Sequence, residues 1–226
     1  MKLILYSGGK YQENRGLNRE LFRLSGVTSP RMVYIPSENN ELDCYFIDWK
    51  NFYLKMGASE CLNFPLKKNI NKELIKKAFS SHIIFLSGGN TFTFLNNLKK
   101  SGLKKEFLEF IGRGGVLAGM SAGSILMTPS IHMAEIPSND QDDNDVRLTD
   151  YDALNLVNFE FSPHYEYDTH GDRELKLYSL QNSKIVYGCE DGSGLIIEGQ
   201  QIRRLGKIWR FINGNKEKVT AKSWSN

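Results

Sequence analysis

The chain has 226 residues, of which 40% are hydrophobic and 24% are charged, a composition typical of a globular protein with a buried core. Its 29 basic and 26 acidic residues leave a net charge of +3, and they form no basic tract, so nothing in the composition indicates a nucleic-acid or membrane partner. We expect a single α/β domain over residues 1–226.

Neither a targeting segment nor a disulfide framework is evident. The N-terminal apolar run Leu3–Tyr6 is shorter than the core of a signal peptide, roughly 7–15 residues. The three cysteines, Cys44, Cys61 and Cys189, are widely spaced and form no C-x-x-C pair, which argues against disulfides and zinc knuckles. We therefore predict a cytoplasmic protein, a monomer or homodimer, with no metal or other cofactor.

Short apolar strands alternate with amphipathic helices in the first half of the chain. This alternation predicts an α/β fold with a mostly parallel sheet flanked by helices. The predicted strands are Leu3–Tyr6, Met32–Ile35, Ile83–Leu86 and Val116–Ala118. The predicted helices, with apolar residues at three- and four-residue steps, are Leu42–Lys55, Lys72–Ala78, Phe92–Leu98 and Leu103–Ile111.

The second half begins with Ser138–Asp150, a polar segment rich in Asp and Asn that predicts an exposed loop. A strand is expected around Phe159–Phe161, a helix over Asp172–Gln181, and an edge strand or frayed end over Asn213–Asn226. From residue 184 the pattern is mostly β, and we expect antiparallel strands to close one edge of the sheet. These strands are Lys184–Tyr187, Gly194–Glu198, Gln201–Leu205 and Ile208–Phe211.

The segment Gly119-Met-Ser-Ala-Gly lies between a predicted strand and a helix, which is the context of a nucleophile elbow. Glycines two residues on either side of Ser121 allow the sharp turn that raises the hydroxyl above the sheet. The alternative is an ordinary strand–helix turn with Ser121 as N-cap. A second turn, Leu86-Ser-Gly-Gly-Asn, could supply oxyanion-hole N–H groups from Gly88 and Gly89, or could be an ordinary βα turn in which Asn90 or Thr91 caps the helix.

A serine nucleophile needs a base, and the chain has only four histidines. His164 follows a predicted strand and Pro163, at the sheet edge where a base for Ser121 must stand. His82, His132 and His170 lie in less suitable segments. The triad carboxylate is then Asp191 or Glu190, both at the end of another strand; the alternative for these two acids is an ordinary turn.

The chain resembles the peptidase E (aspartyl dipeptidase) and cyanophycinase family of serine peptidases over roughly residues 1–211. Six motifs occur in the family order: Gly88-Gly-Asn-Thr-Phe, Gly119-Met-Ser-Ala-Gly, Asp152-Ala-Leu-Asn-Leu, Ser162-Pro-His, Gly171-Asp-Arg-Glu and Gly188-Cys-Glu-Asp-Gly. The resemblance implies a fold like that of class I glutamine amidotransferases, which is flavodoxin-like, and a Ser-His-Glu triad without metal. Carried over, the triad falls on Ser121, His164 and Asp191, with Glu190 adjacent.

The resemblance also implies a substrate, a dipeptide that begins with Asp. Arg173 would hold the Asp side chain, because a guanidinium binds a carboxylate through two parallel hydrogen bonds, and we expect Asn90 to contact substrate as well. Three features depart from the family pattern. The triad acid is Asp rather than Glu, a family aspartate falls at Ile136 next to Glu135, and the acidic loop Asp140–Asp145 looks like an insertion that would repel acidic substrates.

The predicted reaction is acyl transfer from a small peptide to Ser121, with His164 as base and N–H groups near Gly88, Gly89 and Ala122 around the oxyanion. Two alternatives stay open at this point. One is an esterase or omega-peptidase with the same triad, and the other is a binding protein with this fold and no turnover. A calcium site in the loop Asp140–Asp145 is a weaker interpretation than a solvated acidic loop, because the glycine and glutamate of an EF-hand are missing.

Overall fold

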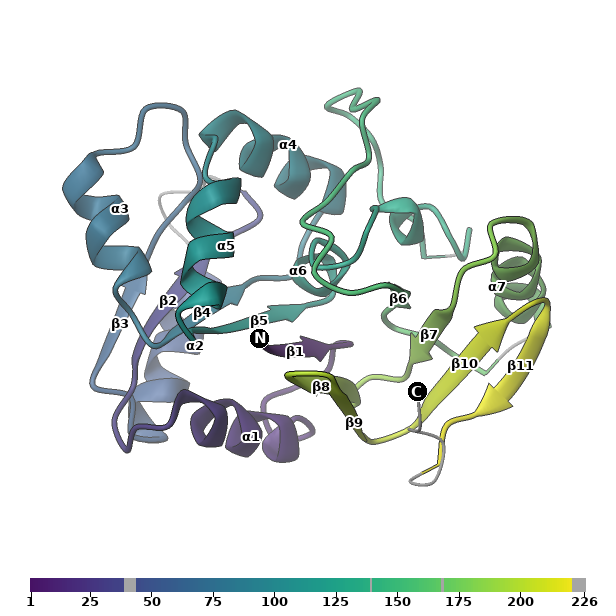
Figure 1. The fold of residues 1–226 in the computed structure, drawn as a ribbon, viewed down its shortest axis with the longest axis horizontal. Helices are drawn as coiled ribbons and strands as arrows, with labels where there is room; N and C mark the ends of the chain where they lie inside the picture. Colours follow the sequence, from purple (N-terminus) through teal and green to yellow (C-terminus); the bar gives the residue numbers. More distant parts are fainter. Residues whose placement is uncertain (39–43, 139, 168, 221–226) are drawn as a thin grey trace.

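Two β-sheets and the helices around them make up the computed structural model, which describes residues 1–38, 44–138, 140–167 and 169–220. The larger sheet has the strand order β3-β2-β4-β5-β1-β8-β9, and the smaller has the order β11-β10-β7-β6. Figure 1 shows the larger sheet with helices on either side and the smaller sheet beside it.

The larger sheet is parallel except at one edge. Its parallel strands are β1 (Lys2–Tyr6), β2 (Arg31–Ile35), β3 (Glu60–Asn63), β4 (Ile83–Leu86) and β5 (Val116–Met120). Two antiparallel strands complete it beside β1, namely β8 (Gly194–Glu198) and β9 (Gln201–Leu205). The predicted fold class, a mostly parallel α/β sheet with C-terminal antiparallel strands, is confirmed.

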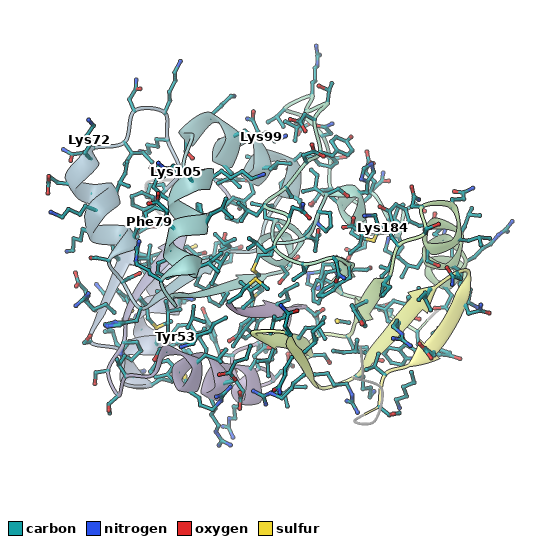
Figure 2. All side chains as sticks on the ribbon, in the orientation of Figure 1. Tyr53, Lys72, Phe79, Lys99, Lys105 and Lys184 are labelled. Carbon is teal, nitrogen blue, oxygen red and sulfur yellow. The ribbon has the colours of Figure 1, made fainter. Side chains whose placement is uncertain are left out.

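Both faces of the central strands are buried, and alternate residues enter separate cores. Leu3 and Leu5 pack in one core while Ile4 and Tyr6 pack in the other. Helices α3 (Lys72–Phe79), α4 (Thr91–Ser101) and α5 (Lys104–Gly112) cover the first face, and α1 (Arg15–Ser25) and α2 (Cys44–Lys55) cover the second. Phe79 and Tyr53, labelled in Figure 2, mark these two opposite layers.

The smaller sheet contains β6 (Glu160–Ser162), β7 (Val186–Cys189), β10 (Ile208–Ile212) and β11 (Asn215–Lys218). Strands β6 and β7 are parallel, and β10 lies antiparallel to both β7 and β11. The helix α7 (Thr169–Gln181) packs on β10 and β11. The sequence pattern identifies β7 and β10 as strands but not this separate sheet, because apolar alternation fixes which face is buried and not which strand is the neighbour.

Most predicted elements occur within a few residues of their expected bounds. Residues 42–43 of the first predicted helix and 221–226 of the tail lie outside the described residues. The loop 138–150 has neither helix nor strand in its described part. Helix α1 and strand β3 were not predicted from the sequence pattern. None of the described helices has the length and apolar content needed to cross a bilayer.

Candidate active site

Ser121 lies on a strained turn between β5 and the one-turn helix α6 (Ala122–Ile125). Its backbone has φ 51° and ψ −114°, a region that residues with a side chain seldom adopt. The hydroxyl makes no N-cap hydrogen bond to the helix, so the alternative of a simple capping serine does not describe it. The helix α6 that follows Ser121 contacts β6 of the smaller sheet, as Figure 1 shows.

The glycines on either side of Ser121 are required by close backbone contacts. A methyl group on Gly119 would lie 2.3 Å from the carbonyl carbon of Gly123, and one on Gly123 would lie 2.4 Å from the carbonyl oxygen of Leu86. Such distances are far shorter than van der Waals contact. The G-x-S-x-G spacing thus lets α6 pack directly on the ends of β4 and β5 and fixes the position of Ser121.

His164 follows β6 and Pro163 and also has a positive φ, 51°. Its Nε2 lies 2.8 Å from Ser121 Oγ, and its Nδ1 lies 2.8 Å from Asp191 Oδ1. With the ring proton on Nδ1, the imidazole donates to Asp191 and accepts from the serine hydroxyl. The three side chains are therefore in the arrangement in which a histidine can remove the serine proton.

The structure distinguishes the two adjacent acids by their direction. Asp191 contacts His164, whereas the Glu190 carboxylate lies 3.1 Å from Lys207 Nζ. Consecutive residues of the turn between β7 and β8 thus point to different partners. Of the two carboxylates that the sequence left open, only Asp191 lies against the imidazole.

Ser7 and Gly8 belong to this site, although the motif analysis did not include them. The buried Ser7 hydroxyl donates to the Cys189 carbonyl oxygen at 2.7 Å and accepts the His164 N–H at 2.8 Å. A methyl group on Gly8 would lie 2.2 Å from His164 Cε1 and 2.4 Å from Asp191 Oδ1. The available signal was the repeated Ser-Gly-Gly, which follows both β1 and β4.

The predicted oxyanion residues surround Ser121 to different degrees. A methyl group on Gly88 would lie 3.6 Å from Ser121 Cβ, so this backbone is beside the nucleophile. Ala122 follows Ser121 directly. Gly89 has φ 121°, and its missing Cβ faces Ser37. In the described part of the chain, none of these three N–H groups donates to a backbone carbonyl outside the regular elements.

Neither of the two residues expected to bind substrate lines the cavity beside Ser121. Asn90 caps α4 by accepting the Thr93 N–H, and its amide donates to the Asp143 carbonyl oxygen, both at 2.8 Å. Capping was the alternative role for Asn90, and the structure shows it. Arg173 is exposed on α7 and does not line the cavity beside Ser121. Contact of either residue with substrate stays a prediction.

A cavity of about 130 Å³ opens beside Ser121. Ser121, His164, Thr91, Asp140 and Asp142 supply its polar groups. Burial raises the pKa of Asp140, and the neighbouring Asp142 and Asp191 raise it further, while His164 opposes them. The remaining lining is apolar: Ile125, Met133, Ala134, Ile136, Pro137 and Pro163.

The acidic loop is held against α4 by its own carboxylate. Asp142 Oδ2 accepts the Thr91 N–H, and the Asp142 N–H donates to the Ala134 carbonyl oxygen, both at 2.8 Å. Asp142 thereby supports the first turn of α4, where negative charge is favourable. No group of three or more His, Cys, Asp or Glu side chains suited to a metal ion occurs within the described ranges.

The other three histidines lie elsewhere. His82 Nδ1 accepts the Arg31 N–H, His132 contacts Ser130, and His170 lies 3.6 Å from Glu174. Burial and the Arg31 charge lower the pKa of His82. Of the four histidines, His164 is the one that contacts Ser121.

A mostly parallel α/β sheet and a smaller sheet beside it, which together hold Ser, His and Asp in line at their strand ends, have the architecture of a serine hydrolase. The chain belongs to peptidase family S51, whose family model matches residues 3–205.

Three similar proteins illustrate this membership. The chain is 34% identical over 131 residues to Lmo0363, an uncharacterized peptidase of Listeria monocytogenes. This match covers 58% of the present chain and 63% of the relative, which is less than two thirds of the relative's length. It is 25% identical to a Drosophila melanogaster protein named "Probable alpha-aspartyl dipeptidase", covering 94% and 89% of the two chains. A crystal structure of a candidate peptidase E from Listeria monocytogenes EGD-e matches with a TM-score of 0.68 and 26% identity, covering 90% and 97% of the two chains.

Proposed function

We propose that this protein is a serine peptidase that hydrolyses small peptides through Ser121, His164 and Asp191. The observation that carries the proposal is the continuous hydrogen-bonded line from Asp191 Oδ1 through the imidazole to Ser121 Oγ, with both contacts at 2.8 Å. The cavity beside the serine is small, which suits a short peptide. Membership of peptidase family S51 supports the same reaction.

The reaction begins when His164 removes the hydroxyl proton of Ser121 and the serine oxygen attacks the peptide carbonyl. Asp191 holds the Nδ1 proton and stabilises the imidazolium that forms. The negative oxygen of the tetrahedral intermediate lies near the backbone of Gly88 and Ala122, whose N–H groups stabilise it. The imidazolium then donates its proton to the leaving amine, and water releases the acyl group by the same steps in reverse.

The same proposal covers the domain organisation, the cellular location and the working form of the protein. We infer a single catalytic domain, because the larger hydrophobic core contains residues of both sheets, for example Leu117 and Phe161. The described cysteines are all free, which supports action in the cytoplasm. A free peptide is the substrate, and a monomer or homodimer without nucleic acid or membrane is the expected working form.

The test of this function is labelling with a fluorophosphonate, a reagent that reacts with activated serines. We expect stoichiometric labelling of the wild type, located to Ser121 by mass spectrometry, and none of Ser121→Ala. The same variant should lose on the order of 10⁴-fold or more in turnover of dipeptides. A wild type that is folded but neither labelled nor active would indicate a binding protein. Activity of Ser121→Ala within tenfold of wild type would disprove the nucleophile.

A preference for an N-terminal Asp has two sources of support. One is the name of the Drosophila relative, "Probable alpha-aspartyl dipeptidase", and the other is Arg173, which the family resemblance places at the substrate carboxylate. The Arg173 side chain is exposed on α7, however, and does not line the cavity. Cleavage of Asp-Leu and Leu-Leu by wild type and Arg173→Met measures this preference, and an unchanged ratio would exclude a role of Arg173 in it.

A further inference from the structure

The cavity beside Ser121 carries negative charge, and this feature bears on the substrate. Asp140 and Asp142 line it, and no Lys or Arg does so among the residues described. Asp142 is fixed by its bond to the Thr91 N–H. The Asp140 carboxylate has no hydrogen bond or ion pair to any described residue, so it is available to a bound group.

The imidazole of His164 faces these two carboxylates and acts to lower the pKa of Asp140. Asp191 lies at Nδ1 of His164, on the opposite side of the ring from Ser121, and its carboxylate is hydrogen-bonded to the imidazole. The pKa of Asp140 is nevertheless raised, chiefly by burial and further by the charges of Asp142 and Asp191. A bound Asp side chain would bring one more carboxylate into this field, while a cation would relieve the repulsion.

The apolar lining suits the remainder of a basic residue. Met133, Ile136 and Pro137 lie in the same wall as the two aspartates. Long basic side chains commonly bury an aliphatic stem along apolar surface and keep the charged end at a polar group. An acidic side chain is too short to separate its charge from Asp140 in the same way.

We propose that the residue on the acyl side of the cleaved bond carries positive charge, which Asp140 and Asp142 bind, and that an acidic residue there is rejected. The proposal rests on the proposed function, since it assigns the substrate of the same site. The cation has two possible sources, the free α-amino group of the peptide and a basic side chain. Both are ammonium or guanidinium groups that a carboxylate binds.

The first experiment measures kcat/KM for the p-nitroanilides of Lys, Ala and Asp and for the N-acetylated Lys compound. We expect Lys to exceed Asp at least tenfold in the wild type, and Asp140→Asn to reduce this ratio at least tenfold. Asp145→Asn is the matched control, because it removes the same charge from the same loop but does not line the cavity. Its ratio should stay within twofold of the wild type.

The comparison of these four substrates identifies the source of the cation. A loss on acetylation alone assigns the α-amino group, and a loss from Lys to Ala assigns the side chain. Equal or better cleavage of the Asp compound would overturn the proposal, and so would a ratio that Asp140→Asn and Asp145→Asn change equally. The Asp140 carboxylate bonds to no residue that the structure describes, so its replacement should leave the fold intact, which circular dichroism checks.

A second measurement separates this proposal from the proposed function. Calorimetry gives the affinity of lysinamide for Ser121→Ala and for the same variant with Asp140→Asn, neither of which needs to turn over. If lysinamide binds and loses at least tenfold in affinity with Asp140→Asn while the wild type hydrolyses nothing, the charge proposal stands and the peptidase function fails. If the wild type cleaves peptides through Ser121 but lysinamide binding is absent or insensitive to Asp140, the reverse holds.

Discussion

At the scale of residues, two neighbouring acids in one turn have separate partners. Asp191 lies 2.8 Å from His164 Nδ1, while Glu190 pairs with Lys207 on the strand connection beside it. Gly8 leaves room for this contact, because any side chain there would overlap both His164 and Asp191. The shorter acid reaches the imidazole because the backbone of residues 7–8 lies so close to it.

Replacing each acid by its amide should therefore have unequal effects. Asp191→Asn should reduce kcat by on the order of 10⁴-fold, because an amide does not hold the Nδ1 proton or stabilise the imidazolium. Glu190→Gln should reduce it less than tenfold. Steady-state kinetics on one dipeptide substrate compares them, and a larger loss in Glu190→Gln would show that Glu190 completes the triad.

The sequence could identify part of this site. Ser121 and His164 follow from the G-x-S-x-G segment and from the few histidines, because each lies next to a recognisable strand. The choice between Glu190 and Asp191 depends on the direction of two adjacent side chains in a turn, which no periodicity records. Ser7 was missed because its hydroxyl supports the site through the Cys189 carbonyl, the His164 N–H and the Asp191 carboxylate, and such a supporting serine has no distinctive sequence pattern.

At the scale of elements, the start of α4 connects the acidic loop to the sheet. Asn90 accepts the Thr93 N–H as the N-cap, and its amide donates to the Asp143 carbonyl oxygen. The Asp142 carboxylate accepts the N–H of Thr91, the first residue of the helix. The helix end therefore supports the loop that lines the cavity, and the loop in turn supplies partners for the first turn of the helix.

Two substitutions of Asn90 separate these contacts. Asn90→Ala removes the cap and the loop contact and should lower the free energy of unfolding by about 1 kcal/mol. Asn90→Ser keeps a capping oxygen and loses only the bond to Asp143, so it should cost a few tenths of that amount. Urea unfolding monitored by circular dichroism measures both. Equal losses would mean that the loop contact, not the cap, stabilises the protein here.

Helix α1 and strand β3 were not predicted from the sequence, and each has a physical reason for being missed. The apolar stripe of α1 includes the buried Asn18, whose side chain accepts hydrogen bonds from the Tyr6 and Tyr53 hydroxyls. Both partners come from other elements, so the pattern by itself looks too polar. Strand β3 has four residues, all only partly buried at the sheet edge, and therefore lacks the apolar run that revealed β1, β2 and β4.

At the scale of the whole molecule, the candidate site joins the two sheets. Ser121 follows a strand of the larger sheet, His164 follows β6 of the smaller one, and Asp191 lies in the turn from β7 to β8 that passes between them. The buried Glu160 of β6 accepts a hydrogen bond from Ser130 at 3.1 Å, and burial raises the pKa of its carboxyl group. The smaller sheet thus contains a buried acid at β6.

This burial predicts how stability depends on pH. Because the folded pKa of Glu160 lies above its unfolded value, the native state binds more protons than the unfolded state in the window above about pH 4.5. Its contribution is therefore favourable below the unfolded pKa and is lost as pH rises through the folded pKa. Glu160→Gln should remove this loss. Its melting temperature, relative to wild type, should rise between about pH 4.5 and 7, and a difference independent of pH would contradict the prediction.

The backbone of Ser121 sets catalysis and stability against each other. Its φ of 51° and ψ of −114° are strained for any residue with a Cβ, by about 1–3 kcal/mol, and glycine relieves such strain. Ser121→Gly should thus unfold at a higher urea concentration than Ser121→Ala, although both lack the hydroxyl; equal midpoints would show that the turn is not strained. A lineage no longer selected for hydrolysis could therefore gain stability by the same mutation that removes its nucleophile.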